Sequence, residues 1–311
     1  MMNRLILVKT FSPVDMAHLY EHLFYGKVSE LFTNAGLYQY VDYSLVGKTL
    51  QPGIVVIDIE LYTADAIELS KTIPNIQIDV NEDAVFSAIT QLMAEEERLP
   101  SNSNFSALKK ELKKLDSIKW TKIDRLALIQ PAHLVSRNTK QIFSISNGKP
   151  QKSTDLTFAI TLDLKVLKEE NNLLPLFYEL SRILIDNLNA TLPYTLGCYS
   201  IGDEFKKTST NISLINTFKV ANTKSINITY DDILESAQNL VKDLKKLKVF
   251  ERHLSSLQKL SYIDAPNLTP NFEDVYNSTG ILIGSSGWKY IATIENFKLI
   301  LNNIHYDVNF S

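Results

Sequence analysis

The chain has 311 residues, of which 45% are hydrophobic and 22% charged, a composition typical of a folded protein and not of a disordered one. Its 32 basic and 35 acidic residues give a net charge of −3, so no basic excess favours nucleic acid or an anionic membrane as a partner. The single cysteine, Cys198, excludes an intrachain disulfide, and no apolar run approaches the roughly 18 residues of a spanning helix. We therefore expect a soluble, cytoplasmic protein.

The first half of the chain predicts strands alternating with helices. Residues 5–10 are apolar and β-branched, as in a short strand. Ser12 and Pro13 predict the start of a helix, with Ser12 as the N-cap, and Gly36 predicts its end after about Asn34. The other predicted elements of this half are strands over residues 37–50 and 54–62 and helices over residues 64–71, 82–99 and 105–118.

The second half begins after a polar, turn-rich segment at residues 147–154, the best candidate for a linker. Both halves mix strands with helices, and short turns join many neighbouring strands. This pattern predicts an α+β protein of two similar domains, residues 1–150 and 151–311, each a mainly antiparallel sheet packed with helices. In the second half we expect strands over 156–162, 197–201, 210–218 and 225–229, helices over 172–189 and 230–260, and shorter apolar pieces at 281–283 and 297–304.

Two of the five histidines lie in one short segment, His18-Leu19-Tyr20-Glu21-His22. Residues four apart share one face of a helix, so both imidazoles can ligate one metal ion. Glu21 borders the same face and can reach a water on that ion. This is the H-x-x-E-H arrangement, the inverse of H-E-x-x-H.

A catalytic zinc site needs a third protein ligand. Residues 85–97 predict an amphipathic helix, and Glu96 falls near the centre of its apolar face, which includes Phe86. Glu95 and Glu97 fall about 80–100° to either side. A carboxylate within a buried stripe is unfavourable unless it is paired or binds a metal, so we choose Glu96, with Glu95 and Glu97 as alternatives.

These features resemble the pitrilysin/insulinase metallopeptidases, which include the mitochondrial processing peptidases. In that family the H-x-x-E-H helix supplies two zinc ligands and the catalytic glutamate. A glutamate in a second helix completes the site after a pattern like V-[VI]-x-[ER]-E, which residues 92–96 match loosely. Ile89 stands seven positions before Glu96, where the family often has a second, supporting glutamate.

The resemblance extends to two weaker segments. Residues 36–42 stand where the family has G-G-x-x-N-A-x-T, the edge strand that pairs with an extended substrate, but Gln39-Tyr40 replaces Asn-Ala. Residues 192–199 are similar to L-R-x-x-G-L-x-Y, a segment whose arginine and tyrosine reach the active site from the other domain. Tyr199 matches the tyrosine, whereas Pro193 replaces the arginine.

The resemblance implies a zinc-dependent peptidase that hydrolyses unstructured peptides or precursor segments, with Zn²⁺ held by His18, His22 and Glu96 in the first domain. Glu21 would take the proton of the zinc-activated water and pass it to the leaving amine, and Tyr199 would donate a hydrogen bond to the developing oxyanion. Substrate would add as a strand to the edge at residues 37–43. Because the family pairs two such units around a chamber, we expect a homodimer or a heterodimer with a related subunit.

The same residues are compatible with two other interpretations. The histidine spacing could be accidental, with both side chains ordinary helix residues. The chain could also be a non-catalytic scaffold or a substrate-binding subunit of a pitrilysin-like heterodimer, which would fit the replaced arginine. Against a scaffold, all four metal-site residues are present, and a scaffold has no physical need for them.

Overall fold

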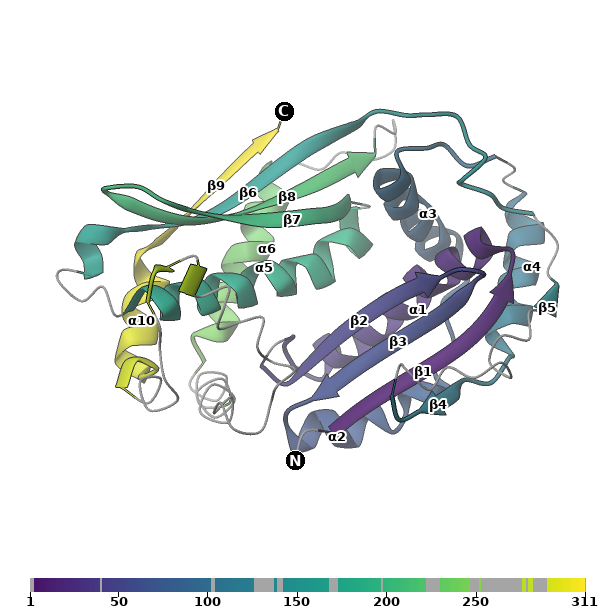
Figure 1. Ribbon diagram of the computed structural model, residues 1–311, viewed down its shortest axis with the longest axis horizontal. Coiled ribbons are helices and arrows are strands. Elements are labelled where there is room, and N and C mark those ends of the chain that lie inside the picture. Colours follow the sequence, from purple (N-terminus) through teal and green to yellow (C-terminus); the bar gives the residue numbers. More distant parts are fainter. Residues whose placement is uncertain are drawn as a thin grey trace. The chain divides into compact units, whose positions relative to one another are not determined.

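The computed structural model of the protein forms two compact units (Figure 1). Each unit has an antiparallel sheet packed with helices, which confirms the predicted α+β class. The residues that the structure describes are 3–39, 41–101, 104–125, 137–138, 142–167, 173–196, 198–221, 230–246, 252, 276–277, 279–281 and 290–310.

The division between the units follows the predicted linker only in part. The main segment of the first unit ends at Thr154, near the expected boundary at residue 150. The first unit also takes in two segments from the second half of the chain, Ala190–Tyr199 and Lys219–Asn227, so Tyr199 belongs to the same unit as the paired histidines. The second unit comprises Asp155–Asn189, Ser200–Phe218 and Ile228–Ser311.

The first sheet has the strand order β2-β3-β1-β4, and β5 pairs in parallel with the end of β1. β1 pairs antiparallel with both β3 and β4, which leaves β2 as an edge strand. The elements of this part of the chain are β1 (Asn3–Ser12), α1 (Val14–Asn34), β2 (Tyr43–Leu50), β3 (Ile54–Leu61), α2 (Ala64–Ser70), η1 (Ile73–Asn75), α3 (Glu82–Glu96), α4 (Phe105–Asp116), β4 (Thr121–Ile123) and β5 (Arg137–Asn138).

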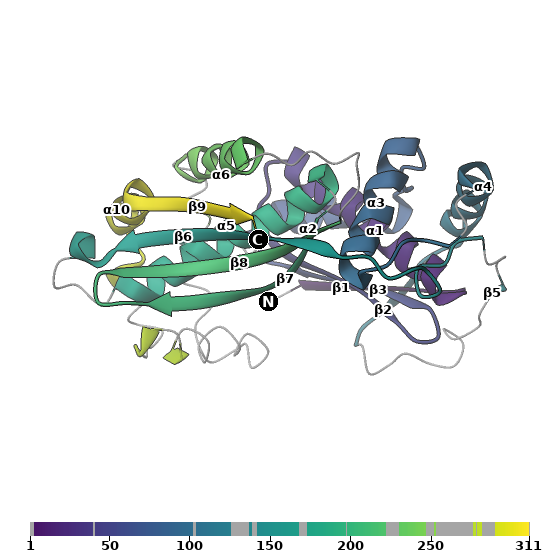
Figure 2. The same ribbon diagram turned by 90° about the horizontal axis from the view of Figure 1, so that it is seen from above.

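The core of the first unit lies between this sheet and α1. Successive side chains of a strand point to opposite faces, and Leu5 and Leu7 of β1 face the main core while Ile6 and Val8 join a small apolar cluster on the other face. α1 packs against β2, β3 and β1 and also against α3 (Figure 2). The side chains of α1 buried there are Met16, Ala17, Leu19, Tyr20, Leu23, Phe24, Val28 and Phe32.

The start of α1 differs from the prediction. The helix begins at Val14, its N-cap position is Pro13, and no side chain caps it. Ser12 was the expected N-cap and that prediction is wrong, because the residue extends β1 and pairs with Asn138 of β5. Asp15, in the first turn, instead accepts hydrogen bonds from the hydroxyls of two serines of the segment after β5.

The strand expected over residues 37–50 is shorter in the structure. Only Tyr43–Leu50 forms β2, and the chain before it makes a turn. The Asp42 carboxylate accepts the backbone N–H of Tyr38 at 2.9 Å, and the Tyr38 carbonyl accepts the N–H of Asp42 at 2.8 Å. These local hydrogen bonds compete with strand pairing, so β2 begins only at Tyr43. Tyr40 lies outside the described residues.

The second sheet repeats the topology of the first. Its order is β7-β8-β6-β9, so in each sheet a strand is followed by a long helix and then by a hairpin whose first strand forms the edge (Figure 1). The elements are β6 (Ser153–Asp163), η4 (Leu164–Leu167), α5 (Leu174–Leu196), β7 (Cys198–Lys207), β8 (Asn211–Ala221), α6 (Tyr230–Leu244), α10 (Ile294–Asn303) and β9 (Ile304–Phe310).

The end of the chain agrees less well with the prediction. The helix expected over residues 230–260 is α6, which ends at Leu244. The apolar piece at 297–304 is the end of α10, and it leads into β9. The strand expected at 225–229 lies outside the described residues, as does most of 281–283. No helix in the described ranges is long and apolar enough to cross a membrane.

Candidate metal centre

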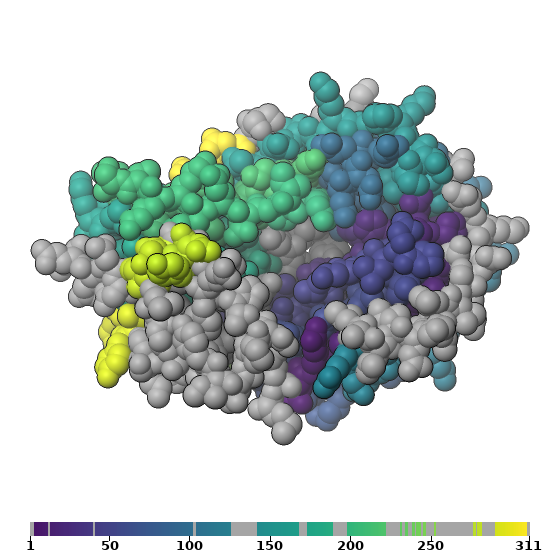
Figure 3. Space-filling model, in the orientation of Figure 1, coloured from purple at the N-terminus to yellow at the C-terminus, as the bar shows by residue number. Residues whose placement is uncertain are grey.

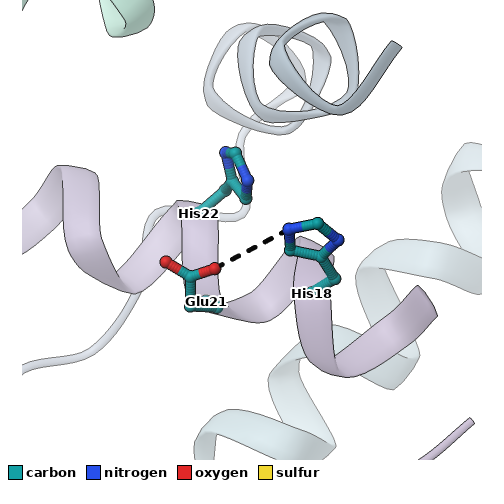
Figure 4. A group of neighbouring side chains, drawn as sticks. All are labelled: His18, Glu21 and His22. Carbon is teal, nitrogen blue, oxygen red and sulfur yellow. Dashed lines mark ion pairs between the residues drawn. The ribbon is translucent and has the colours of Figure 1, made fainter. Parts of the chain in front are cut away.

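Three side chains of the H-x-x-E-H segment project from the same side of α1 (Figure 4). One ligand atom from each of His18, Glu21 and His22 lies within 4.8 Å of the others. The helix was predicted from its apolar spacing, and its packing against the sheet turns the histidine face toward α3. Glu21 and His22 are buried, and His18 is partly buried. Local structure therefore brings the two imidazoles and one carboxylate together as expected.

Glu95, near the end of α3, closes this group from the opposite side. Its Oε2 atom lies 3.1 Å from Nε2 of His22 and 3.3 Å from Nε2 of His18. The two imidazole rings stand 5.0 Å apart, centre to centre. Two ring nitrogens and one carboxylate oxygen thus lie close together, and two histidines with one glutamate form a donor set found in catalytic zinc sites.

Glu96, the ligand chosen from the sequence, lies at the margin of this group. Its Oε1 atom is 3.8 Å from Nδ1 of His18, and its side chain is 41% exposed. Glu97 is directed elsewhere, since it has a left-handed backbone and its carboxylate binds the Lys219 ammonium at 2.7 Å. The distances therefore favour Glu95 over the predicted Glu96.

The difference arises from the rotation of α3. The sequence placed Phe86 on the buried face of this helix, and that prediction is wrong, because Phe86 is 45% exposed. Gln91 is only 2% exposed and lies one turn before Glu95 on the face toward α1. This face of α3 buries polar residues beside the histidines, so apolar spacing alone misjudges its centre.

Gln91 is a functional candidate that the sequence analysis missed. Its Oε1 atom lies 2.9 Å from Nδ1 of His22, and its Nε2 atom donates to Oγ of Ser87 at 3.5 Å. With the amide oxygen turned toward the ring, Nδ1 of His22 is a donor, so Nε2 is the nitrogen that would bind a metal once it has lost its own proton. Ile89, at the position of the family's supporting glutamate, packs instead against the apolar core.

The electrostatics of the group favour an added positive charge. Burial raises the pKa of Glu21, although the charges of His22 and His18 act in the other direction. Burial lowers the pKa of His22, but its hydrogen bond to Glu95 and the charges of Glu21 and Glu95 outweigh that effect and raise it to about 9. Burial likewise raises the pKa of Glu95, and hydrogen bonds from both histidines lower it overall. A proton on an imidazole or a bound cation satisfies the same carboxylates.

Tyr199, the predicted oxyanion donor, lies beside Glu95. It is the second residue of β7, and its partly buried ring packs against the core of the first unit. Burial raises the pKa of Tyr199 to about 12, and the charge of Glu95 and a hydrogen bond to that carboxylate act in the same direction. The structure therefore places Tyr199 against Glu95 of the candidate metal centre.

The strand at the end of the sheet near this centre is β2 (Tyr43–Leu50). The predicted edge at residues 37–43 is a turn, which contributes only a single bridge from Gln39 to Tyr43. Gly47 of β2 lies against Glu21, since a methyl group built on Gly47 would overlap the Oε1 atom of Glu21. The β2–β3 hairpin reaches the surface in the space-filling view, where it is dark blue (Figure 3). A strand added to this edge would pass beside the Glu21 carboxylate.

Comparisons with known proteins add a loose likeness to solved structures. No family model matches the chain, and neither does any curated protein. A protease from Helicobacter pylori aligns with 99% of this chain and 93% of its own length, at 12% identity and a TM-score of 0.33. A conserved protein from Enterococcus faecalis V583 aligns with 99% and 93%, at 11% identity and a TM-score of 0.32. Pitrilysin aligns with 99% of this chain and 44% of its own, at 10% identity and a TM-score of 0.25.

Proposed function

We propose that this chain is a zinc-dependent peptidase of the pitrilysin/insulinase type. The observation that carries the proposal is the convergence of His18 Nε2, His22 Nε2 and one oxygen of Glu95, with the Glu21 carboxylate beside them. Two imidazoles and a carboxylate, with a further carboxylate that is not needed as a ligand, are the parts of a hydrolytic zinc site. We assign Glu95 as the third ligand in place of Glu96.

The chain's own residues then have distinct tasks. Bound zinc would supply Lewis-acid polarisation of the scissile carbonyl and would acidify a water molecule. Glu21, whose burial raises its pKa, takes the water's proton on its carboxylate and transfers it to the leaving amine nitrogen. Gln91 fixes the orientation of the His22 ring, and Tyr199 donates a hydrogen bond to the oxygen that becomes negative.

The substrate class follows from the sheet edge. β2 ends the strand order of the first sheet and passes beside Glu21. Over the part of the chain that the structure describes, its outer side pairs only through the Gln39–Tyr43 bridge, and an extended backbone can add to it through main-chain hydrogen bonds. A folded protein rarely offers such a backbone, so we propose unstructured peptides or precursor segments as substrates. As in the family it resembles, the chain is proposed to work in a pair, with itself or with a related subunit.

Metal analysis and one substitution test this function. The purified protein is expected to hold stoichiometric zinc and to cut a pool of unstructured peptides, with cleavage sites read by mass spectrometry. Glu21→Gln keeps the size and the metal ligands but removes the proton acceptor. We expect it to retain zinc and to lower cleavage by about 10²–10⁴-fold, the usual contribution of a general base.

A scaffold subunit would behave differently. It would purify without stoichiometric zinc, and a chelator would change neither its structure nor its partner binding. Cleavage at the wild-type rate by the Glu21→Gln variant would rule out the proposed base.

A further inference from the structure

We propose that Gly47 is a positioning residue that keeps the Glu21 carboxylate beside the metal and prevents it from becoming a ligand. The proposal rests on the zinc peptidase function above and names a residue of the edge strand on which that chemistry depends. Its basis is the close approach of β2 to α1 at one position, where the sequence has no side chain.

The inward side chains of β2 fill the space between the strand and α1, except at residue 47. Tyr43 and Leu45 point to this side and are fully buried in the core. Gly47 is the next inward position, because strand side chains alternate. A Cβ atom there would overlap Oε1 of Glu21 and would lie 3.0 Å from its Cδ atom and 3.1 Å from Cδ2 of Tyr25. The carboxylate and the Tyr25 ring thus occupy the space that a side chain would need.

Backbone conformation does not explain this glycine. Among the described glycines, Gly36, Gly53, Gly202 and Gly280 have positive φ, but Gly47 does not, and it pairs regularly with Ile57 of β3. A glycine within a strand weakens the strand and often marks a close approach of another group. Here the approaching group is Glu21, the proposed catalytic base. The absence of a side chain at Gly47 therefore leaves room for the Glu21 carboxylate.

The geometry also indicates where Glu21 would move if a side chain were added. One carboxylate oxygen faces β2 at Gly47, and the other lies 3.9 Å from Nε2 of His18. Tyr25 lies one turn further along α1 and closes the remaining side of the space. A methyl group at residue 47 would therefore push the carboxylate away from the strand and toward the imidazoles. There it would add a ligand to the metal and lose its freedom to accept a proton.

The test uses the metal alone as its first probe. Co²⁺ replaces Zn²⁺ in the purified full-length protein, and its visible absorption reports the number of ligands. For Gly47→Ala we expect a spectrum with one more ligand, a Co²⁺ affinity equal to or higher than that of the wild type, and a loss of peptide cleavage of at least about a hundredfold. When Glu21 is replaced by alanine, a methyl group at residue 47 has no carboxylate to displace. The Glu21→Ala variant and the Glu21→Ala/Gly47→Ala double variant are therefore expected to give the same Co²⁺ spectrum.

A control on the same strand separates this effect from general damage to β2. Lys48 is the neighbouring residue on the opposite, exposed face, and Lys48→Ala is expected to leave the Co²⁺ spectrum unchanged. If Gly47→Ala alone does not fold, Glu21→Asp/Gly47→Ala gives the methyl group room by shortening the carboxylate arm. Recovery of folding in that pair supports the proposal, and continued misfolding assigns the conflict to Tyr25 and overturns it.

Other outcomes overturn the proposal in ways that distinguish it from the function. A wild-type spectrum and cleavage rate in Gly47→Ala would overturn the role of Gly47 while the peptidase function stands. If Gly47→Ala and Glu21→Ala/Gly47→Ala lose Co²⁺ affinity to the same extent, Gly47 supports the fold of the strand and does not position Glu21, which would overturn the proposal. Failure of the wild-type protein itself to bind Co²⁺ would overturn both proposals.

Discussion

Glu95 and Glu96 are adjacent residues with different places in the site, and their substitution separates them. Oε2 of Glu95 lies within 3.3 Å of both Nε2 atoms, whereas Glu96 approaches only Nδ1 of His18, at 3.8 Å. We expect Glu95→Gln to weaken Zn²⁺ binding by more than the roughly 10–100-fold that is typical of an outer-shell residue, and Glu96→Gln to change it by less than about threefold. Competition with a chromophoric chelator measures both affinities, and the reverse order would restore Glu96 as the ligand.

Gln91 is predicted to act through His22 and not by touching the metal. Gln91→Leu removes the acceptor for Nδ1 of His22 while keeping a similar volume, and we expect a 10–100-fold loss of Zn²⁺ affinity. Gln91→Glu keeps the acceptor and is expected to restore the affinity. The ¹⁵N shifts of the His22 ring in the zinc-loaded protein report which ring nitrogen carries the proton. An unchanged tautomer and affinity in Gln91→Leu would limit the residue to packing.

Glu95 and Gln91 show how much of the candidate site the sequence could predict. The spacing of His18, Glu21 and His22 was sufficient, because one helical turn fixes their mutual positions. The third ligand depends on how α3 is rotated against α1, and tertiary packing sets that rotation. The contact of Gln91 with His22 could not be predicted from the sequence, since a single glutamine on a helix has many possible hydrogen-bond partners.

At the scale of elements, a buried polar cluster joins β1, α1 and α4. Lys9 is 4% exposed; its Nζ donates to the Tyr20 hydroxyl at 2.7 Å and lies 4.7 Å and 4.6 Å from the ring centres of Tyr20 and Trp120. Tyr20 in turn donates to the Asp116 carboxylate at 2.8 Å. This cluster fixes the side of α1 opposite the histidines, so it holds the face that carries His18 and His22 in place.

The cluster makes a pH-dependent contribution to stability. Burial lowers the pKa of Lys9 to about 8, against the smaller effect of Asp116, while the unfolded value is 10.5. Below pH 8 the folded state bears the full penalty for burying a charged lysine, and the penalty falls as pH rises toward 10.5. Stability from this group therefore increases by about 1.5 kcal/mol between pH 8 and 9.5.

Lys9→Met tests this by removing the charge and keeping the chain that packs on the two rings. We expect the free energy of unfolding of the wild type, relative to Lys9→Met, to rise over that pH range. Urea unfolding at each pH measures it, and the difference cancels other titrating groups. The matched control, Lys71→Met, removes an exposed lysine of the surface ion pair with Glu68 and should follow the wild type. A flat difference for Lys9→Met would contradict the assignment.

The helices and strands were predicted correctly where the hydrophobic periodicity agreed with the capping and turn residues at their ends. Asn81 caps α3 and Asn104 caps α4, as residues of this type commonly do, and both helices begin where the sequence indicated. β4 was missed, because three residues carry no pattern. The start of β2 was predicted too early, because the Asp42 carboxylate accepts a hydrogen bond from the Tyr38 amide and forms a turn there. The alternation of apolar and polar side chains gives no sign of this turn.

At the scale of the whole molecule, the two sheets share one topology, but among the described residues the candidate metal ligands all lie in the first unit. α5 takes the place in its unit that α1 takes in the first, and it contains no histidine. Burial raises the pKa of Asp186 on α5 to about 7, and Asp203 and Glu179 act in the same direction. Arg182 lowers that pKa, so an arginine already supplies positive charge to this cluster.

This asymmetry predicts one zinc ion per chain. Over the described ranges, His18, Glu21 and His22 are the one group of three histidine, cysteine or acidic side chains whose ligand atoms all lie within 4.8 Å of one another, and Glu95 lies against the same two histidines. Native mass spectrometry with metal analysis is therefore expected to give one zinc for each 35.3 kDa chain, in a complex of two chains or of this chain with a related subunit. The His18→Ala/His22→Ala variant should lose that ion and keep the second unit folded. Two zinc ions per chain, or an ion retained in the double variant, would place metal chemistry outside α1 and contradict the division of roles between the two units.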